Sequence, residues 1–279
     1  GVNMPRWLES MLAGGPCFSA ALGFWNWTMS IVQILLGMSP QEYSPGAWTY
    51  ITDSIYPWFM GMGAMFLNMF TLIGFCRQAS NLKENVTMEM WIELFIKIII
   101  CNTLLINGLS IMQEFTSFAS DVTSGVLGDT IPQIYGDDID LGFSLSMVLF
   151  GPLYLILVIA CATTILEEVM SRFLNLYLLI GSAPLALCTI AGGRGMDNTA
   201  VAWFKSFLTS VLQIAAIAFI LQICSHIINS STFGEAATWD VFGWFNGAGS
   251  VLMSIVTVVF LTAAVKGSDA FLKRAFDLR

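Results

Sequence analysis

The stretch YLLIGSAPLALCTIAGGRGMDN, residues 177–198, decides the topology of this chain. It opens as an uncharged apolar run, but Pro184 removes one helix hydrogen bond and glycines follow from Gly192 onward. If the stretch crosses a bilayer completely, every later segment changes sides. The rest of the sequence must therefore decide whether it crosses or only enters.

The composition indicates an integral membrane protein. Hydrophobic residues make up 56% of the 279 residues, charged residues make up 11%, and the mean hydropathy is +0.76. A soluble domain has about 45–50% apolar and about 25% charged residues. Lipid or neighbouring helices must therefore surround most side chains, and each uncharged run of about 18 residues or more is a candidate span.

The uncharged runs predict an all-α, polytopic membrane helix bundle with five crossings. They lie at about 50–76, 90–113, 141–166, 206–234 and 241–265, within a membrane domain over 50–279. Residues 1–49 contain Trp25 and Trp27 among polar residues, which favours an amphipathic N-terminal region lying in the interface.

Acidic residues mark the loops that we expect outside the cell. Residues 114–140 contain acids and no Lys or Arg, and Glu235 with Asp240 gives a second loop of the same character. The acids of the first loop are Glu114, Asp121, Asp129, Asp137, Asp138 and Asp140.

Basic residues gather at the opposite ends of the predicted crossings. They are Arg77, Lys83, Arg172, Arg194, Lys205, Lys266, Lys273, Arg274 and Arg279. The positive-inside rule places them in the cytosol. The five crossings then predict a multi-pass protein of the cytoplasmic membrane, with the amino end outside and the carboxyl end inside.

This arrangement requires that residues 173–193 do not make a separate crossing, because a sixth would export Arg194 and Lys205. Pro184 and the glycines at 192, 193 and 195 permit a re-entrant or in-plane segment. Non-helical backbone is tolerated at membrane depth where protein or a water-filled cavity satisfies it. The alternative is a straightforward sixth helix that is kinked at Pro184.

Three stretches resemble the TrbL-like family of conjugal transfer proteins, in the form found on Gram-positive conjugative elements. They are SPGAWTYITDSIY (44–56), FCRQASNLKENVTMEMWIELFIKIIICNTLLINGLSIM (75–112), and the segment from APLALCTIAGG to TAVAWFKSFLTSVLQIAAIAF (183–219). The resemblance covers roughly residues 40–265. Its pattern is Ala-Pro-Leu and small residues followed by a Lys-bearing helix.

The resemblance implies a channel or scaffold subunit of a type IV secretion system. Such subunits form homo-oligomers around a translocation axis, and partner ATPases drive DNA and protein across the membrane. Membrane lipids, other secretion subunits, single-stranded DNA and its relaxase are the implied partners. The short acidic loop 114–140 departs from the larger outer region of Gram-negative relatives, and without Lys or Arg it cannot neutralise phosphates.

The sequence offers no pattern typical of an enzyme, so none of its residues is predicted to be catalytic or to hold a cofactor or metal. No GxxxxGK[ST] motif is present, and the single histidine, His226, excludes a histidine cluster. We expect a protein that is not an enzyme.

Two features are candidates for a conduit or for packing. Glu93 and Lys97, spaced i,i+4 within an apolar run, can neutralise each other; we expect them to turn that face toward the bundle interior or to line a conduit. A secondary transporter of a small solute that uses this pair is the alternative function. Gly243 and Gly247 form a GxxxG motif at which another helix can approach closely. Pro184, Arg194 and Lys205 complete the candidate residues.

Overall fold

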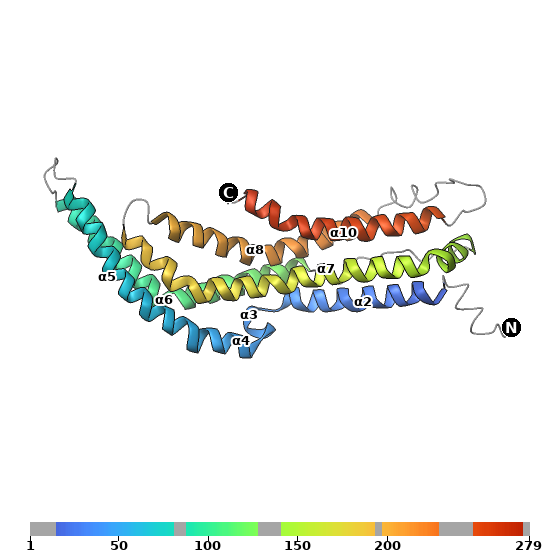
Figure 1. The fold of residues 1–279 in the computed structure, drawn as a ribbon, viewed down its shortest axis with the longest axis horizontal. Helices are drawn as coiled ribbons and strands as arrows, with labels where there is room; N and C mark the ends of the chain where they lie inside the picture. The colour runs from blue at the N-terminus through green and yellow to red at the C-terminus, as the bar shows by residue number, and fades with distance from the viewer. Residues whose placement is uncertain (1–14, 81–87, 128–140, 193–196, 229–247, 276–279) are drawn as a thin grey trace. The chain divides into compact units, whose positions relative to one another are not determined.

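The computed structural model describes residues 15–80, 88–127, 141–192, 197–228 and 248–275. Within these ranges the elements are all helical (Figure 1). They are α2 (Gly15–Gly37), α3 (Pro40–Tyr43), α4 (Pro45–Tyr50), the π-helical turn η1 (Ile51–Ile55), α5 (Tyr56–Ser80), α6 (Met88–Val126), α7 (Leu141–Leu187), the 3-10 turn η2 (Cys188–Gly192), α8 (Asp197–Ile228) and α10 (Ala248–Ala275).

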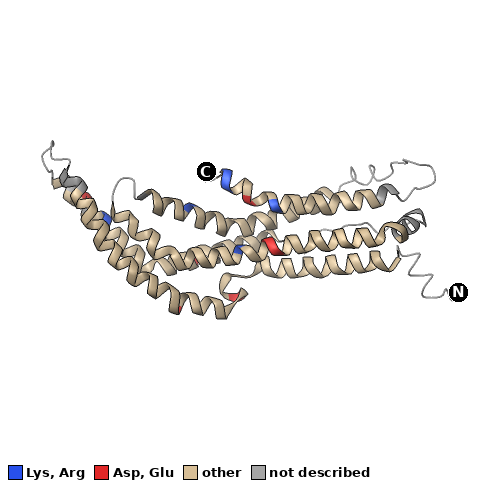
Figure 2. Ribbon diagram, viewed as in Figure 1, with Lys and Arg blue, Asp and Glu red and all other residues tan. Residues whose placement is uncertain are grey.

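Six helical stretches are long and apolar enough to span a membrane, and the prediction of an all-α polytopic membrane bundle is confirmed. The stretches are Gly15–Gly37, Pro45–Cys76, Trp91–Val126, Val148–Gly192, Asn198–Ile228 and Val251–Ala275. Charged residues are sparse on their ribbons, and α2 carries none (Figure 2). The described helices therefore present apolar surface along most of their length.

The chain divides into two compact units that share the long helices. Among the described residues, unit 1 contains α2 and most of α10, with residues 141–170 of α7 and 214–228 of α8. Unit 2 contains α3 to α5, most of α6, the end of α7 with η2, and residues 197–213 of α8.

In unit 1, α2 packs one face against the first half of α7. Its buried side chains are spaced three and four residues apart and include Phe18, Ala21, Trp25, Met29, Val32 and Leu36. A Cβ on Gly15 would lie 3.5 Å from Val148, and the rings of Phe18 and Tyr154 are 5.8 Å apart. Residue numbers rise together in these contacts, so α2 runs parallel to α7.

The two tryptophans of α2 differ in exposure. The Trp25 side chain is 1% exposed, whereas Trp27 is 57% exposed. Trp25 points into unit 1 because it falls on the three-and-four spacing that faces α7, while Trp27 falls outside it. The interfacial position of residues 1–49 stays a prediction.

A buried hydrogen bond connects α7 to α10 in the same unit. The hydroxyl oxygens of Tyr154 and Ser254 are 2.6 Å apart, and both side chains are buried. A hydroxyl pair of this kind satisfies two polar groups that neither lipid nor apolar side chains could satisfy.

In unit 2, α5 and α6 form an antiparallel hairpin. At one end the rings of Phe75 and Trp91 lie 5.4 Å apart. At the other end the Tyr56 hydroxyl donates a hydrogen bond to the Leu105 carbonyl at 3.4 Å.

A capping interaction orders the chain that enters this unit. The backbone N–H and hydroxyl of Ser39 donate to the Glu42 carboxylate at 2.9 and 3.0 Å, at the start of α3. These bonds favour the ionised carboxylate and lower the pKa of Glu42, with the backbone N–H as the larger cause.

Two helices continue through charged residues beyond the predicted crossings. The expected crossing 141–166 and segment 173–193 are joined in the single helix α7, which passes through residues 167–172. Glu168 and Arg172 stand at the i,i+4 spacing that supports a helix, and strong helix formers surround them. Likewise, α6 continues to Val126, so Glu114 and Asp121 lie on a helix rather than in a loop.

Candidate functional site

The segment that decides the topology ends in close contact with α5. A Cβ on Gly74 would lie 2.9 Å from the Ala191 carbonyl oxygen, and one on Gly63 would lie 3.0 Å from the Pro184 carbonyl oxygen. We call these four residues the α5–α7 seam. Only glycine leaves room for the two backbones to approach this closely.

Side-chain donors reach the carbonyls at the end of α7, where the helix no longer supplies backbone donors. The Cys188 thiol donates to Leu185 O at 3.0 Å and the Thr189 hydroxyl to Ala186 O at 2.7 Å. From α6, the Cys101 thiol donates to Leu187 O at 3.2 Å. These three side chains therefore supply hydrogen bonds to the carbonyls of Leu185, Ala186 and Leu187.

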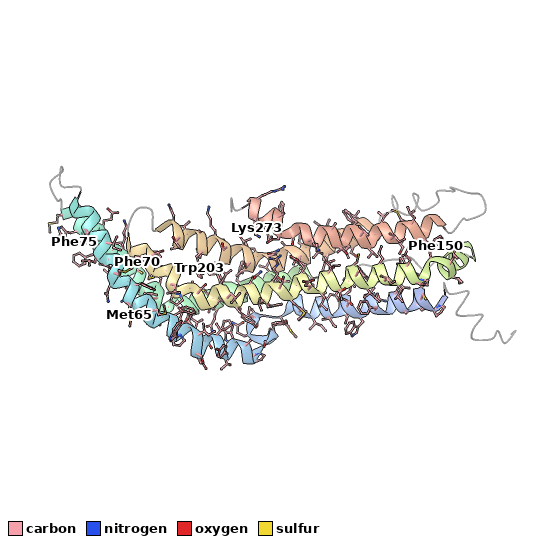
Figure 3. The ribbon with its side chains drawn as sticks, viewed as in Figure 1. Met65, Phe70, Phe75, Phe150, Trp203 and Lys273 are labelled. Carbon is pink, nitrogen blue, oxygen red and sulfur yellow. The ribbon has the colours of Figure 1, made fainter. Side chains whose placement is uncertain are left out.

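A buried cluster lies beside the α5–α7 seam. It consists of Leu67 of α5, Cys101 and Leu105 of α6, and Cys188 with Ala191 of η2, and Phe66 and Phe70 pack against it (Figure 3 labels Phe70). Protein therefore surrounds most of the turn η2.

α8 is tied to α7 in the same unit. The Trp203 indole N–H donates to the Leu179 carbonyl at 3.2 Å (Figure 3). Its ring stacks on Phe207 with a centroid distance of 5.6 Å. Because α8 follows α7 after a short connection, these contacts define an antiparallel pair.

The charged pair on α6 forms as its spacing predicts. Lys97 Nζ lies 2.7 Å from Glu93 Oε1, and the side chain of Lys97 is 27% exposed and that of Glu93 60%. The expectation that this face turns toward the bundle interior or lines a conduit stays a prediction. A transporter site enclosed by the chain's own described helices would need the pair on an inner face.

The remaining candidate residues divide between the described part and the rest. Pro184 lies in the last turn of α7 and contributes to the α5–α7 seam, and Lys205 lies half-buried on α8. Arg194, Gly243 and Gly247 fall outside the described residues, as do the acids at 129, 137, 138 and 140. In the described residues no three His, Cys, Asp or Glu side chains gather as metal ligands would.

No family model, no curated protein and no solved structure matches this chain significantly. Function must therefore be inferred from the sequence and the packing of this chain. Sequence reasoning missed Gly74, Trp203 and Tyr56, because a glycine or aromatic residue in an apolar run carries no sign of the partner it will meet. The only available signal was the glycine spacing of α5.

Proposed function

We propose that this chain is a channel or scaffold subunit of a conjugative type IV secretion system in the cytoplasmic membrane. The resemblance of residues 44–56, 75–112 and 183–219 to the TrbL-like family is the source of this proposal. The protein would help to move a DNA–protein substrate, and partner ATPases would supply the energy. Its own role is structural, and it is not an enzyme.

The observation that best supports an assembly role is the exposure of α5 and α6. Only 17% and 18% of their apolar windows are buried, whereas the window of α8 is 50% buried. Met65 of α5 points away from the neighbouring helices (Figure 3) and is 74% exposed. A helix pair that the chain itself barely covers offers surface to lipid and to further copies in a ring.

The placement of the basic residues supports opposite sides for the two ends of the chain. With these residues in the cytosol and five crossings, the amino end is outside and the carboxyl end is cytoplasmic. Within unit 2, α5 runs parallel to the end of α7, since Gly63 lies by Pro184 and Gly74 by Ala191.

Conjugation tests the function. We expect deletion of this chain from its element to abolish transfer, and two differently tagged copies to co-purify from mild detergent. The double substitution Glu93→Ala and Lys97→Ala should lower the transfer frequency without preventing membrane insertion, because it removes the ion pair and leaves the helix apolar. Ile96→Ala, on the same exposed stretch of α6, is the matched control and should leave transfer unchanged. Normal transfer by the deletion strain would refute the proposed function.

A further inference from the structure

A small cavity lies in unit 1, where α2 passes α8 beside the residue that follows α6. Its volume is about 10 Å³. Met29, Gln33 and Leu36 of α2 form one wall, and Leu221 and Gln222 of α8 form part of the other. All five residues belong to unit 1. We call this space the α2–α8 cavity.

Two carboxamides supply the polar side chains of its wall. Gln33 comes from α2 and Gln222 from α8, and both side chains are half-buried. Each carboxamide carries two N–H donors and a carbonyl oxygen with two lone pairs, so one partner elsewhere does not exhaust it. Both helices are long and apolar enough to span a membrane. Hydrocarbon cannot hydrogen-bond to a carboxamide, which therefore turns toward protein or water.

The size and the chemistry of the α2–α8 cavity select its occupant. A water molecule needs a cavity of about 10–15 Å³ and two to four hydrogen-bonding groups, whereas a purely apolar cavity stays dry. This cavity is at the lower end of that range and has two carboxamides in its wall. The described residues that line it carry no charge, so an ion would find no counter-charge there. A larger ligand would not fit.

We propose that the α2–α8 cavity binds one water molecule, which hydrogen-bonds to the side chains of Gln33 and Gln222 and so joins α2 to α8. Water both donates and accepts, and can therefore bridge two carboxamides whichever way their amide groups are turned. α2, which also packs on α7, thereby gains a polar attachment to a second helix. This water site goes beyond the proposed function and does not depend on it, because every group that forms the site lies in one chain.

X-ray radiolytic labelling of the full chain in lipid nanodiscs tests this proposal. Ionised water forms hydroxyl radicals where it stands, so a buried methionine is oxidised quickly only if a water molecule lies beside it. Met29 lines the cavity and is 1% exposed. Met112 of α6 is the matched control, since it is 3% exposed and lies outside the cavity wall. We expect Met29 to form its sulfoxide at least about fivefold faster than Met112, as measured by mass spectrometry of the peptides.

The double substitution Gln33→Leu and Gln222→Leu tests the role of the carboxamides. It replaces them with apolar side chains of similar size, so the cavity should become dry and the oxidation rate of Met29 should fall to that of Met112. Ile34→Leu, at a 55% exposed position of α2, is the control variant and should leave the rate of Met29 unchanged.

Two results would overturn the water site. One is slow oxidation of Met29 in the parent protein, at the rate of Met112, because the cavity would then be dry. The other is rapid oxidation of Met29 in the folded double variant, because the water would then not depend on the carboxamides. The first comparison uses the unmodified chain, so it decides the proposal even if the double variant does not fold.

Discussion

At the scale of residues, the contact of Gly74 with Ala191 is possible because glycine has no Cβ. A methyl group at position 74 would stand 2.9 Å from a backbone carbonyl oxygen, closer than real Cβ contacts allow. A methyl group at position 63 would stand 3.0 Å from the Pro184 carbonyl oxygen, which is tighter than nine in ten real Cβ contacts. Because backbone atoms cannot rotate away as a flexible side chain can, α5 would have to move away from η2.

We therefore predict that Gly74→Ala and Gly63→Ala destabilise the protein by about 1–3 kcal/mol each, the usual cost of overpacking. Gly61→Ala is the matched control on the same helix, since a Cβ at that position meets nothing within 4 Å. It should be neutral or stabilising, because alanine favours helix by up to about 1 kcal/mol over glycine. Thermal unfolding in detergent micelles measures all three, and equal midpoints would argue against the α5–α7 seam.

At the scale of elements, α7 is the feature that most changes the sequence prediction. Its 47 residues extend about 70 Å at 1.5 Å per residue, more than twice the hydrocarbon thickness. The charged residues at 167–172 looked like the end of a crossing, yet the helix runs through them. A helix can continue beyond a bilayer wherever its backbone hydrogen bonds are internal, so charges bound the membrane span without bounding the helix.

Proline substitution in the middle of α7 tests this continuity. Met170 is 44% exposed, so Met170→Ala should have little effect on stability. Met170→Pro removes a helix hydrogen bond and clashes with the preceding turn, at a cost of about 3 kcal/mol or more. Denaturant unfolding of the two variants gives the difference. If the proline variant were as stable as the alanine variant, residues 167–172 would form a connection between two separate segments.

At the scale of the whole molecule, the distribution of basic residues limits the number of crossings. Length and composition alone admit six spans. Five crossings keep the basic residues in the cytosol, so we predict that residues before α2 and residues after α10 lie on opposite sides of the membrane.

Reporter fusions measure the side of the membrane on which each end of the chain lies. A fluorescent protein after α10 should fluoresce, and alkaline phosphatase before α2 should be active, since these reporters function in the cytosol and outside, respectively. A fluorescent protein inserted between η2 and α8 is an internal control and should be cytosolic. If both ends gave cytosolic signals, α2 would make a crossing of its own.

The sequence by itself determined the class of protein, the helical content and the grouping of charges. Those properties follow from composition and from local spacing, which any helix in lipid obeys. It also predicted the Glu93–Lys97 pair, because i,i+4 neighbours on one helix meet whatever surrounds them.

Only the tertiary structure decided which face of each helix is buried and where the long helices truly end. Helices that are apolar on nearly every side carry little periodic signal, so the burial of Trp25 and the outward direction of Glu93 depend on partners distant in the sequence. The close approach at Gly74 also depends on a partner distant in the sequence. The sequence shows that position 74 lacks a side chain, but only the structure shows that the Ala191 carbonyl lies there.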